Sequence, residues 1–281
     1  MSLREKELTM RVITTLGFLA LSSVSCSLLP VTPSPPHPVA PPAGMVLIPA
    51  GPFLMGSDAA DGSLGIEIGV DETPRHSVNV AAFYIDKYEV TNAEYGKYVA
   101  AVGSAYQPAP WRERDALNKE PNHPVGDTDF YDAEAYCTWV GKRLPTEAEW
   151  EKAARGPDGA AYPWGSAFSR DKANTLETGL AWSKPVGSYP QGASVYGVED
   201  LIGNVWEWTS SWYEPYPGNT VQRAAYGKQF RVMRGGSWGA PAVPFARSAN
   251  RHAPELFAIN NRNTDWHTGY DVGFRCAKDA K

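Results

Sequence analysis

The sequence of 281 residues has no long apolar run, no excess of basic residues and only three cysteines. The apolar stretch over residues 12–21 is too short to cross a bilayer, for which a helix needs about 20 apolar residues. With 26 basic against 31 acidic residues, nothing in the charge balance favours nucleic acid as a partner. Residues 44–281 contain no internal repeat, second linker or low-complexity segment, so we treat them as a single domain.

The residues that are abundant indicate a loop-rich globular domain. Apolar residues make up 43% of the chain, which is enough to support a core. Glycine (26) and proline (24) are frequent, and ten tryptophans provide large rings that can pin the loops between short elements. Long regular helices are therefore not expected to form the skeleton.

The N-terminal segment resembles the signal of a bacterial lipoprotein. Arg11 precedes the apolar run, and the small residue Ser25 directly precedes Cys26. We expect residues 1–26 to direct export and Cys26 to be lipidated; in the alternative, ordinary cleavage leaves Cys26 as a free thiol or removes it. The proline-rich residues 27–43 are predicted to form an extended tether. The protein is thus predicted to be exported and lipid-anchored in the cell envelope, in the outer membrane or facing the periplasm.

Three helices are predicted from start signals and apolar spacing. Thr91 and Thr146 each open a capping box with a glutamate three residues later, and Asp132 can cap a further helix between them. The inward faces of the three are predicted to hold Tyr95, Tyr98, Val99 and Val102; Ala135, Tyr136, Trp139 and Val140; and Trp150, Ala153 and Ala154. Alternating runs at residues 77–85 and 229–234 are predicted as strands, which gives an α+β domain.

Several short motifs occur in a fixed order along the chain. They are residues 45–51, 55–56, 71–76, 88–92, 141–150, 162–165, 203–208, 234–238 and 273–276. Together they resemble the formylglycine-generating enzyme (sulfatase-modifying factor) family over residues 44–279. The resemblance implies an α+β, distorted C-type-lectin-like fold with low regular secondary structure.

The resemblance also assigns the cysteines. It implies a disulfide between Cys137 and Cys276, which in the entropy model restricts the unfolded chain by roughly 4–5 kcal/mol; two buried free thiols are the alternative. The family's oxidase binds copper(I) through two further thiolates, soft ligands for a soft ion. Those positions match Val243 and Ser248 here. Valine cannot ligate copper and a serine hydroxyl is a hard substitute, so copper and the oxidase activity are not expected.

A calcium site is implied at a loop before and within the Trp-Glu-Trp motif. The matching ligands are Asp200, Gly203, Val205 and Glu207, two carboxylates with two backbone carbonyls between them. A solvated acidic turn is the alternative. A second, weaker calcium site matches at Asn174 and Thr175, but nearby positions depart from the family's ligands, and we do not expect it to bind.

A binding groove is a further expectation around the vacant copper positions. Trp206 and Trp238 could floor a groove for a peptide or sugar, and Arg247 and Arg251 could clamp a carboxylate or phosphate. The alternatives are tryptophans that fill the core and arginines that pair with structural acids. His252, Asp265 and His267 could form an improvised iron or zinc site, but dispersed surface or hydrogen-bonded histidines are the favoured interpretation.

Three functions follow from these residues. We expect a non-catalytic binding or scaffold lipoprotein with structural calcium, whose partner is an envelope protein or peptide, or a glycan. The first alternative is a divergent envelope enzyme that matures secreted peptides. The second is a formylglycine-generating oxidase that acts on sulfatases without thiolates, which the cysteine count opposes.

Overall fold

The computed structural model describes residues 41–58, 67–103, 120–180, 182–253 and 271–280. Ala40–Lys281 form one compact unit. The predicted signal and tether, residues 1–26 and 27–43, lie outside the described residues apart from the last three of the tether. Among the residues that are described, no helix is long and apolar enough to span a membrane.

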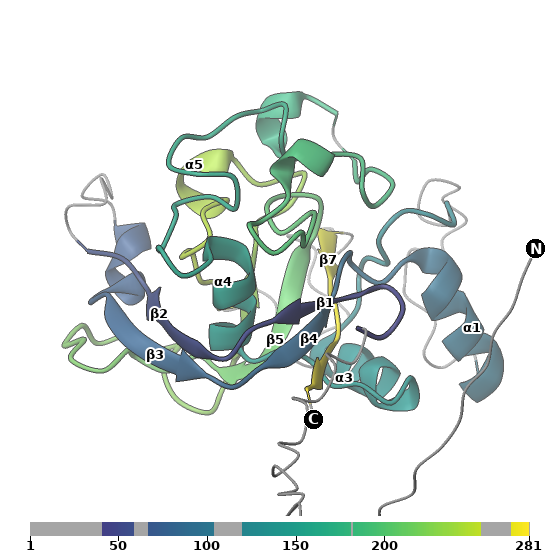
Figure 1. Cartoon of the computed structure of the whole chain (residues 1–281), viewed down its shortest axis with the longest axis horizontal. Helices are drawn as coiled ribbons and strands as arrows, with labels where there is room; N and C mark the ends of the chain where they lie inside the picture. The colour runs from purple at the N-terminus through teal and green to yellow at the C-terminus, as the bar shows by residue number, and fades with distance from the viewer. Residues whose placement is uncertain (1–40, 59–66, 104–119, 181, 254–270, 281) are drawn as a thin grey trace, which may run out of the picture. The chain divides into compact units, whose positions relative to one another are not determined.

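Three small sheets carry the strands of the domain (Figure 1). In the first, β4 (Phe83–Asp86) lies between β1 (Met45–Ile48) and β8 (Ala277–Asp279), antiparallel to both. The second pairs β2 (Gly51–Met55) with β3 (His76–Val80). In the third, β5 (Trp206–Trp212) is antiparallel to β6 (Arg231–Arg234) and parallel to β7 (Val272–Gly273).

Four helices and three 3₁₀ turns complete the described elements. The helices are α1 (Asn92–Val102), α3 (Phe130–Trp139), α4 (Glu147–Arg155) and the one-turn α5 (Ala242–Phe245). The 3₁₀ turns are η2 (Glu67–Glu72), η5 (Leu176–Thr178) and η6 (Pro190–Gly192). In Figure 1 the strands and α4 occupy the lower part of the view, and long irregular loops lie above them. The low content of regular structure agrees with the composition.

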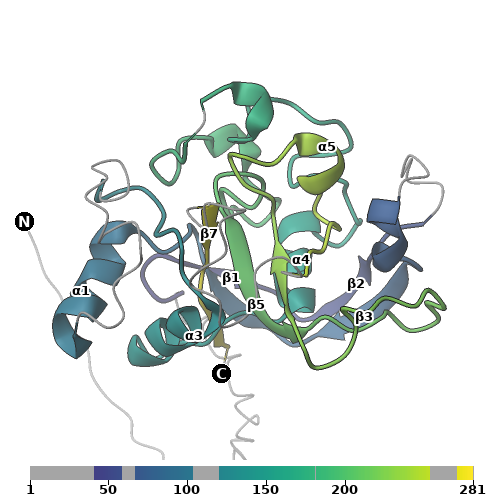
Figure 2. The ribbon, with the colours of Figure 1, turned by 180° about the vertical axis from the view of Figure 1, so that it is seen from behind.

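Two of the core clusters lie around α1, α3 and α4. α4 places Trp150, Ala153 and Ala154 in full burial against strands that include Ile48 and Ile85. The second cluster joins α1, α3 and the third sheet through a set of packed aromatic rings, Tyr95, Tyr98, Tyr136, Phe274 and Trp208. Figure 2 shows from behind that β5 lies between α1 and α3 on one side and α4 on the other.

The helix starts agree with the capping predictions at two of three positions. Both residues of each capping box, at Thr91 and at Thr146, make the reciprocal hydrogen bonds, and α4 ends at Gly156 as expected. The middle helix begins earlier than predicted, because Asp129 rather than Asp132 accepts the capping bond from the Asp132 amide (2.8 Å). Residues 77–85 form two strands, β3 and β4, which belong to different sheets.

Two residues predicted to face inward are exposed instead. Val102 is 41% exposed and Trp139 is 46% exposed, whereas Tyr98 and Tyr136 on the same helices are buried. Val102 lies in the last turn of α1 and Trp139 in the last turn of α3, and the described elements do not bury these ends. The apolar spacing predicted both helices correctly, but it continues into the last turn of each helix, which the core does not cover.

The predicted disulfide between Cys137 and Cys276 is confirmed. The bond joins α3 to the residue that precedes β8, and both cysteines are fully buried. The sheet that contains β8 is thereby linked covalently to the helix.

Candidate functional site

The two positions at which the family's oxidase has copper thiolates contain no sulfur. Val243 lies in α5, and Ser248 follows three residues after that helix ends. Ser248 is fully buried, its amide donates to the Ala161 carbonyl (2.9 Å), and its Oγ atom has no hydrogen-bond partner among the described residues. Both cysteines of the described residues are used by the disulfide. The described residues therefore contain no thiolate that could bind copper here.

The arginines near these positions are ion-paired within the chain. Arg247 donates two hydrogen bonds to Glu72 (2.9 and 2.6 Å), and Arg251 donates two to Glu147 (2.8 and 3.0 Å). The Arg251 side chain is 1% exposed and that of Arg247 is 16% exposed. In this structure the ion-pairing alternative describes both residues, and a ligand would have to displace a carboxylate to reach them.

A third buried arginine links this region to α4. Arg234 is fully buried, and its guanidinium contacts Glu151 and the carbonyls of Ala249 and Asn250. Glu151 also accepts from Arg155 (2.8 Å) and from the amide of Gly56 (2.8 Å). These contacts hold the segment that leads from Ser248 to Arg251 against the helix.

The two tryptophans of the expected groove have different environments. Trp206 is 6% exposed and stacks on His252, with ring centroids 5.1 Å apart. Trp238 is half-buried and lies 5.5 Å from the Trp182 ring. Trp206 thus fills the core, while Trp238 has part of its ring at the surface. His267 and Asp265, weighed above as metal ligands with His252, lie outside the described residues.

The loop predicted to bind calcium has an unusual backbone. Asp200, Gly203 and Asn204 all have positive φ angles, of 56°, 76° and 62°. A side chain on Gly203 would place its Cβ atom 2.2 Å from the Asn174 carbonyl oxygen, so glycine is required at this position. Asp200 accepts a hydrogen bond from the Gly187 amide (2.6 Å) and is 7% exposed. Burial raises its pKa to about 6.

Glu207, the last predicted calcium ligand, is already strongly hydrogen-bonded. Arg275 donates to both of its carboxylate oxygens (2.7 Å each), and the Trp150 indole donates to Oε2 (2.8 Å). Glu207 and Arg275 are 1% and 0% exposed. A carboxylate oxygen has more than one lone pair, so these bonds leave room for a cation but do not require one.

Glu89 is a third carboxylate at this loop, and it was not predicted. It is 2% exposed, and neither of its carboxylate oxygens has a hydrogen-bond partner in the described structure. Burial, followed by repulsion from Asp200, raises the pKa of Glu89 well above its ordinary value, and Arg275 opposes this shift. One guanidinium therefore faces three buried carboxylates. The sequence offered one signal, an acidic residue directly before the apolar Val90 in the motif at residues 88–92.

This donor set fits calcium. Carboxylate and carbonyl oxygens are the ligands that calcium takes, and a buried carboxylate without any partner is costly unless a proton or a cation neutralises it. No group of three or more Asp, Glu, His or Cys side chains in the described residues already has a metal-binding arrangement. The predicted site uses two such side chains, Asp200 and Glu207, with two carbonyls, and the buried, unpartnered Glu89 lies among the charges around it without being one of its ligands.

At the weaker calcium position, a hydroxyl takes the place that a cation would need. Thr178 Oγ1 lies 3.1 Å from Asn174 Oδ1 and 2.8 Å from the Thr175 carbonyl, the two oxygens predicted as ligands. The Asn174 amide nitrogen donates to the Trp182 carbonyl (2.8 Å). One hydroxyl thus lies within hydrogen-bond distance of both oxygens, and its single hydrogen can satisfy one of them at a time.

Comparison with known proteins shows the class to which this fold and site belong. The family model of the sulfatase-modifying factor enzyme 1-like domain matches residues 31–280, so the chain belongs to this family. Its fold is the α+β, distorted C-type-lectin-like fold of the formylglycine-generating enzymes. The structure of PvdO from Pseudomonas aeruginosa is similar, with a TM-score of 0.65 at 30% identity over 84% of this chain and 94% of that one.

Some relatives are named as formylglycine-generating enzymes, and another is named as an inactive one. The chain is 34% identical to inactive C-alpha-formylglycine-generating enzyme 2 of Mus musculus, over 84% of this chain and 86% of that protein. It is 33% identical to the formylglycine-generating enzyme of Streptomyces coelicolor, over 89% and 95%. It is 36% identical to hercynine oxygenase of Mycolicibacterium smegmatis over 70% of its length, but it spans only 55% of that protein.

Proposed function

We propose that this protein is an envelope lipoprotein whose sulfatase-modifying factor-like domain binds or holds a partner, with structural calcium, and does not generate formylglycine. The observation that carries this proposal is the absence of a thiolate pair at Val243 and Ser248. The likeness to a mouse relative named as inactive supports it. The proposed partner is an envelope protein, a peptide or a glycan, and the proposed membrane link is the lipid anchor at Cys26.

A divergent enzyme is the competing function, and the metal content separates the two. The purified protein is expected to contain calcium and neither copper nor iron in stoichiometric amount. Copper and a peptide with a Cys-X-Pro-X-Arg sequence should yield no aldehyde by mass spectrometry, because no thiolate holds the copper. A Val243→Cys/Ser248→Cys variant is expected to gain copper(I) binding. Aldehyde formation by the unchanged protein, or stoichiometric iron, would overturn the proposal.

Calcium is proposed to be held by Asp200 and Glu207 with the carbonyls of Gly203 and Val205. Its chemistry there would be neutralisation of buried carboxylates, which stabilises the folded state. At a calcium concentration 100 times the dissociation constant, the gain is about 2.7 kcal/mol, or roughly 5–10 °C in melting temperature for a domain of this size. A chelator is expected to remove this gain.

Removing an oxygen ligand tests this site. Asp200→Ala lacks the side-chain oxygens and is expected to abolish the calcium-dependent shift in melting temperature. Glu207→Ala should abolish it as well, but it also leaves the buried Arg275 without its carboxylate partner, so it is the less specific change. The matched control is Glu134→Gln, an exposed glutamate of α3. A melting temperature of the unchanged protein that does not respond to chelator would show that the calcium site is wrong.

A further inference from the structure

The disulfide and the proposed calcium loop (residues 200–207) are joined by one short run of residues. This connecting segment, residues 272–276, begins as β7, which pairs with β5 at Glu207. Arg275 donates to both carboxylate oxygens of Glu207 (2.7 Å each). The next residue, Cys276, is bonded through its sulfur to α3. The connecting segment therefore contacts the last predicted calcium ligand and also carries one half of the disulfide.

The connecting segment also packs closely on the calcium loop. A side chain on Gly273 would place its Cβ atom 2.4 Å from the Val125 carbonyl oxygen and 3.0 Å from a methyl carbon of Val205. The carbonyl of Val205 is one of the proposed calcium ligands. Glycine thus allows the close approach of β7 to the loop, and a displacement of the connecting segment would disturb the packing of the loop.

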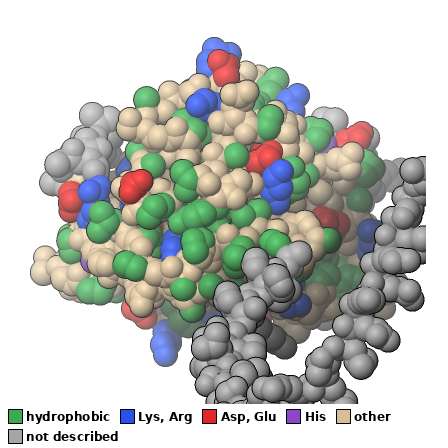
Figure 3. Space-filling model, in the orientation of Figure 1, with side chains coloured by type: hydrophobic (Ala, Val, Ile, Leu, Met, Phe, Trp, Pro, Cys, Tyr) green, Lys and Arg blue, Asp and Glu red, His purple; other side chains and the backbone are tan. Residues whose placement is uncertain are grey.

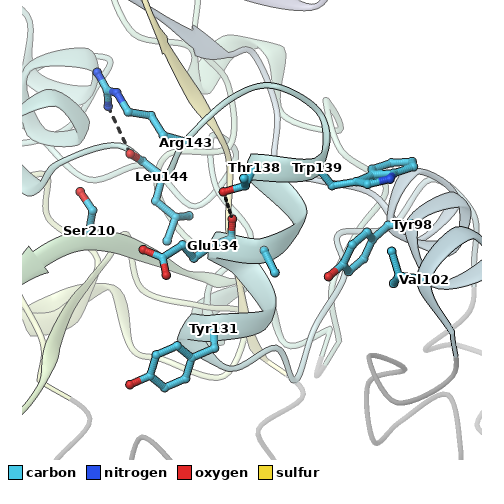
Figure 4. Close-up of a pocket in the computed structure, with 10 residues that line it drawn as sticks. Tyr98, Val102, Tyr131, Glu134, Thr138, Trp139, Arg143, Leu144 and Ser210 are labelled. Carbon is cyan, nitrogen blue, oxygen red and sulfur yellow. Dashed lines mark hydrogen bonds between the residues drawn. The ribbon is translucent and has the colours of Figure 1, made fainter.

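The sulfur atoms of the disulfide cannot be reached without a movement of the chain. Both cysteines are fully buried. A groove of about 590 Å³ lies along the exposed face of α3 (Figure 4), but neither cysteine lines it. A thiolate attacks a disulfide at sulfur, so reduction of the folded protein requires an opening that exposes one of the two sulfur atoms.

An opening at Cys276 disturbs the ion pair of the calcium loop. The Cys276 amide donates to Asp86 Oδ2 (3.1 Å), and its carbonyl accepts from the Asp86 amide (2.8 Å). Exposing the Cys276 sulfur breaks these bonds and moves the backbone. The Cα atom of Arg275 is only about 3.8 Å away along the chain. The same movement therefore pulls the Arg275 guanidinium away from Glu207.

An opening at Cys137 leads to the same segment. Next to Cys137 in α3, the ring of Tyr136 lies 5.4 Å from the ring of Phe274, a fully buried residue of the connecting segment. Beyond the end of α3, Arg143 and Ala277 exchange two backbone hydrogen bonds (2.9 and 2.6 Å). A movement of the end of α3 is thus transmitted to residues on both sides of the other cysteine.

Given the calcium site proposed above, we propose that the disulfide, the connecting segment and the calcium loop open as one unit, so that bound calcium protects the disulfide from a dithiol reductant. In the reduction, the dithiol gives up two electrons and two protons and becomes a cyclic disulfide, while the S–S bond of the protein becomes two thiols. Calcium that binds only the closed unit lowers the population of the open unit by one plus the ratio of free calcium to its dissociation constant. Loss of calcium would therefore make the disulfide available to dithiols.

The rate of reduction in the full chain tests this coupling. The protein is incubated with dithiothreitol at graded free calcium, free thiols are alkylated, and the peptides with Cys137 and Cys276 are quantified by mass spectrometry, with Cys26 counted separately. At free calcium about 100 times the dissociation constant, measured by calorimetry on the oxidised protein, the rate is expected to fall roughly 100-fold. In urea that unfolds the chain, calcium should have no effect on the rate.

Two variants separate an effect of the loop from a general effect of calcium. Asp200→Ala lacks a ligand, so its reduction rate is expected not to respond to calcium. Glu134→Gln, at an exposed position of α3 outside the loop, is the control and should keep the full response. On the face shown in Figure 3, acidic and basic side chains are interspersed, so this face offers no acidic patch for non-specific calcium. If Asp200→Ala does not fold, the calcium titration of the unchanged protein still decides.

Hydrogen exchange distinguishes this local opening from unfolding of the whole domain. In chelator, peptides from residues 200–207 and 271–279 are expected to share one degree of protection, lower than that of α4, whose residues are nearly all buried. Calcium should raise their protection by the same factor by which it slows reduction. Protection of α4 no higher than that of these peptides would mean that the whole domain opens, and would overturn the proposal.

The remaining outcomes separate the coupling from the calcium site itself. If calcium binds but does not slow reduction, the coupling is wrong and the calcium site stands. If the oxidised protein binds no calcium, the calcium site is wrong and the coupling is overturned with it. Protection by calcium that persists in Asp200→Ala would place the ion elsewhere and would also overturn the proposal.

Discussion

Replacing Arg275 with methionine is expected to lower the free energy of unfolding by about 3–5 kcal/mol, the usual effect of removing one partner of a buried ion pair. Arg275 is fully buried and donates to both oxygens of Glu207, and it also contacts the carbonyls of Asp86 and Lys87. Without it, Glu207 loses both of its arginine hydrogen bonds, and Glu89 loses the positive charge that opposes the rise in its pKa. Urea unfolding followed by tryptophan fluorescence measures the loss.

Arg143→Met is the matched control for this change. The Arg143 side chain is 37% exposed and pairs with Glu149 and Asp279. Water reaches the Arg143 guanidinium although Glu149 is largely buried, so the control should lose less stability than Arg275→Met. The double variant Arg275→Met/Glu207→Met is expected to be more stable than Arg275→Met alone, because it removes a buried charge together with its partner. Equal losses for Arg275→Met and Arg143→Met would refute the idea that the buried pair dominates.

Calcium should reduce the loss caused by Arg275→Met if it binds at this loop. The cation would neutralise the carboxylates that the arginine no longer faces. The difference in free energy of unfolding between Arg275→Met and the unchanged protein is therefore expected to be larger in chelator than in calcium. The same set of measurements thus relates the ion pair to the proposed metal site.

Replacing both Cys137 and Cys276 with alanine is the second change with a large expected effect. Removal of a native disulfide costs about 2–5 kcal/mol, and in the entropy model the long loop favours the upper part of this range. The two cysteines are 139 residues apart, so the bond restricts much of the unfolded domain. Melting temperature with and without reductant measures the effect.

The same experiment has an internal control. Both cysteines are fully buried. Reductant should therefore cleave the disulfide of the native protein no faster than local unfolding exposes it. Once reduced, the unchanged protein is expected to melt close to the double alanine variant, whereas the variant itself should not respond to reductant. A double variant that melts at the temperature of the oxidised protein would show that the disulfide contributes little.

Local features of the fold could be predicted because neighbouring residues form them. The capping boxes at Thr91 and Thr146 need only residues three positions apart, and both were found as expected. The cap of α3 was misplaced by three residues because Asp129 and Asp132 are both suitable, and the choice depends on how the preceding loop arrives. The local sequence therefore predicted where the helices lie more accurately than it predicted the residue at which α3 begins.

The environment of each site residue could not be predicted in the same way. Glu89, Asp200 and Glu207 come from three separate segments, and nothing near Glu89 in the sequence indicates that two other carboxylates face it. Arg247 and Arg251 looked available for a ligand, but Glu72 and Glu147, from distant segments, take both of them. Periodicity places Trp139 on an apolar face, yet the core covers only part of that face.

The sequence by itself determined the family, the helix starts, the pairing of the two cysteines through the family resemblance, and the absence of sulfur at Val243 and Ser248. Each of these depends on residue identity or on neighbours along the chain. The tertiary structure alone decided which carboxylates share the loop at Asp200, which arginines are already paired, and that a groove lies open along α3. These features arise from packing between remote segments, where burial sets the free energy of every charge and exposed ring.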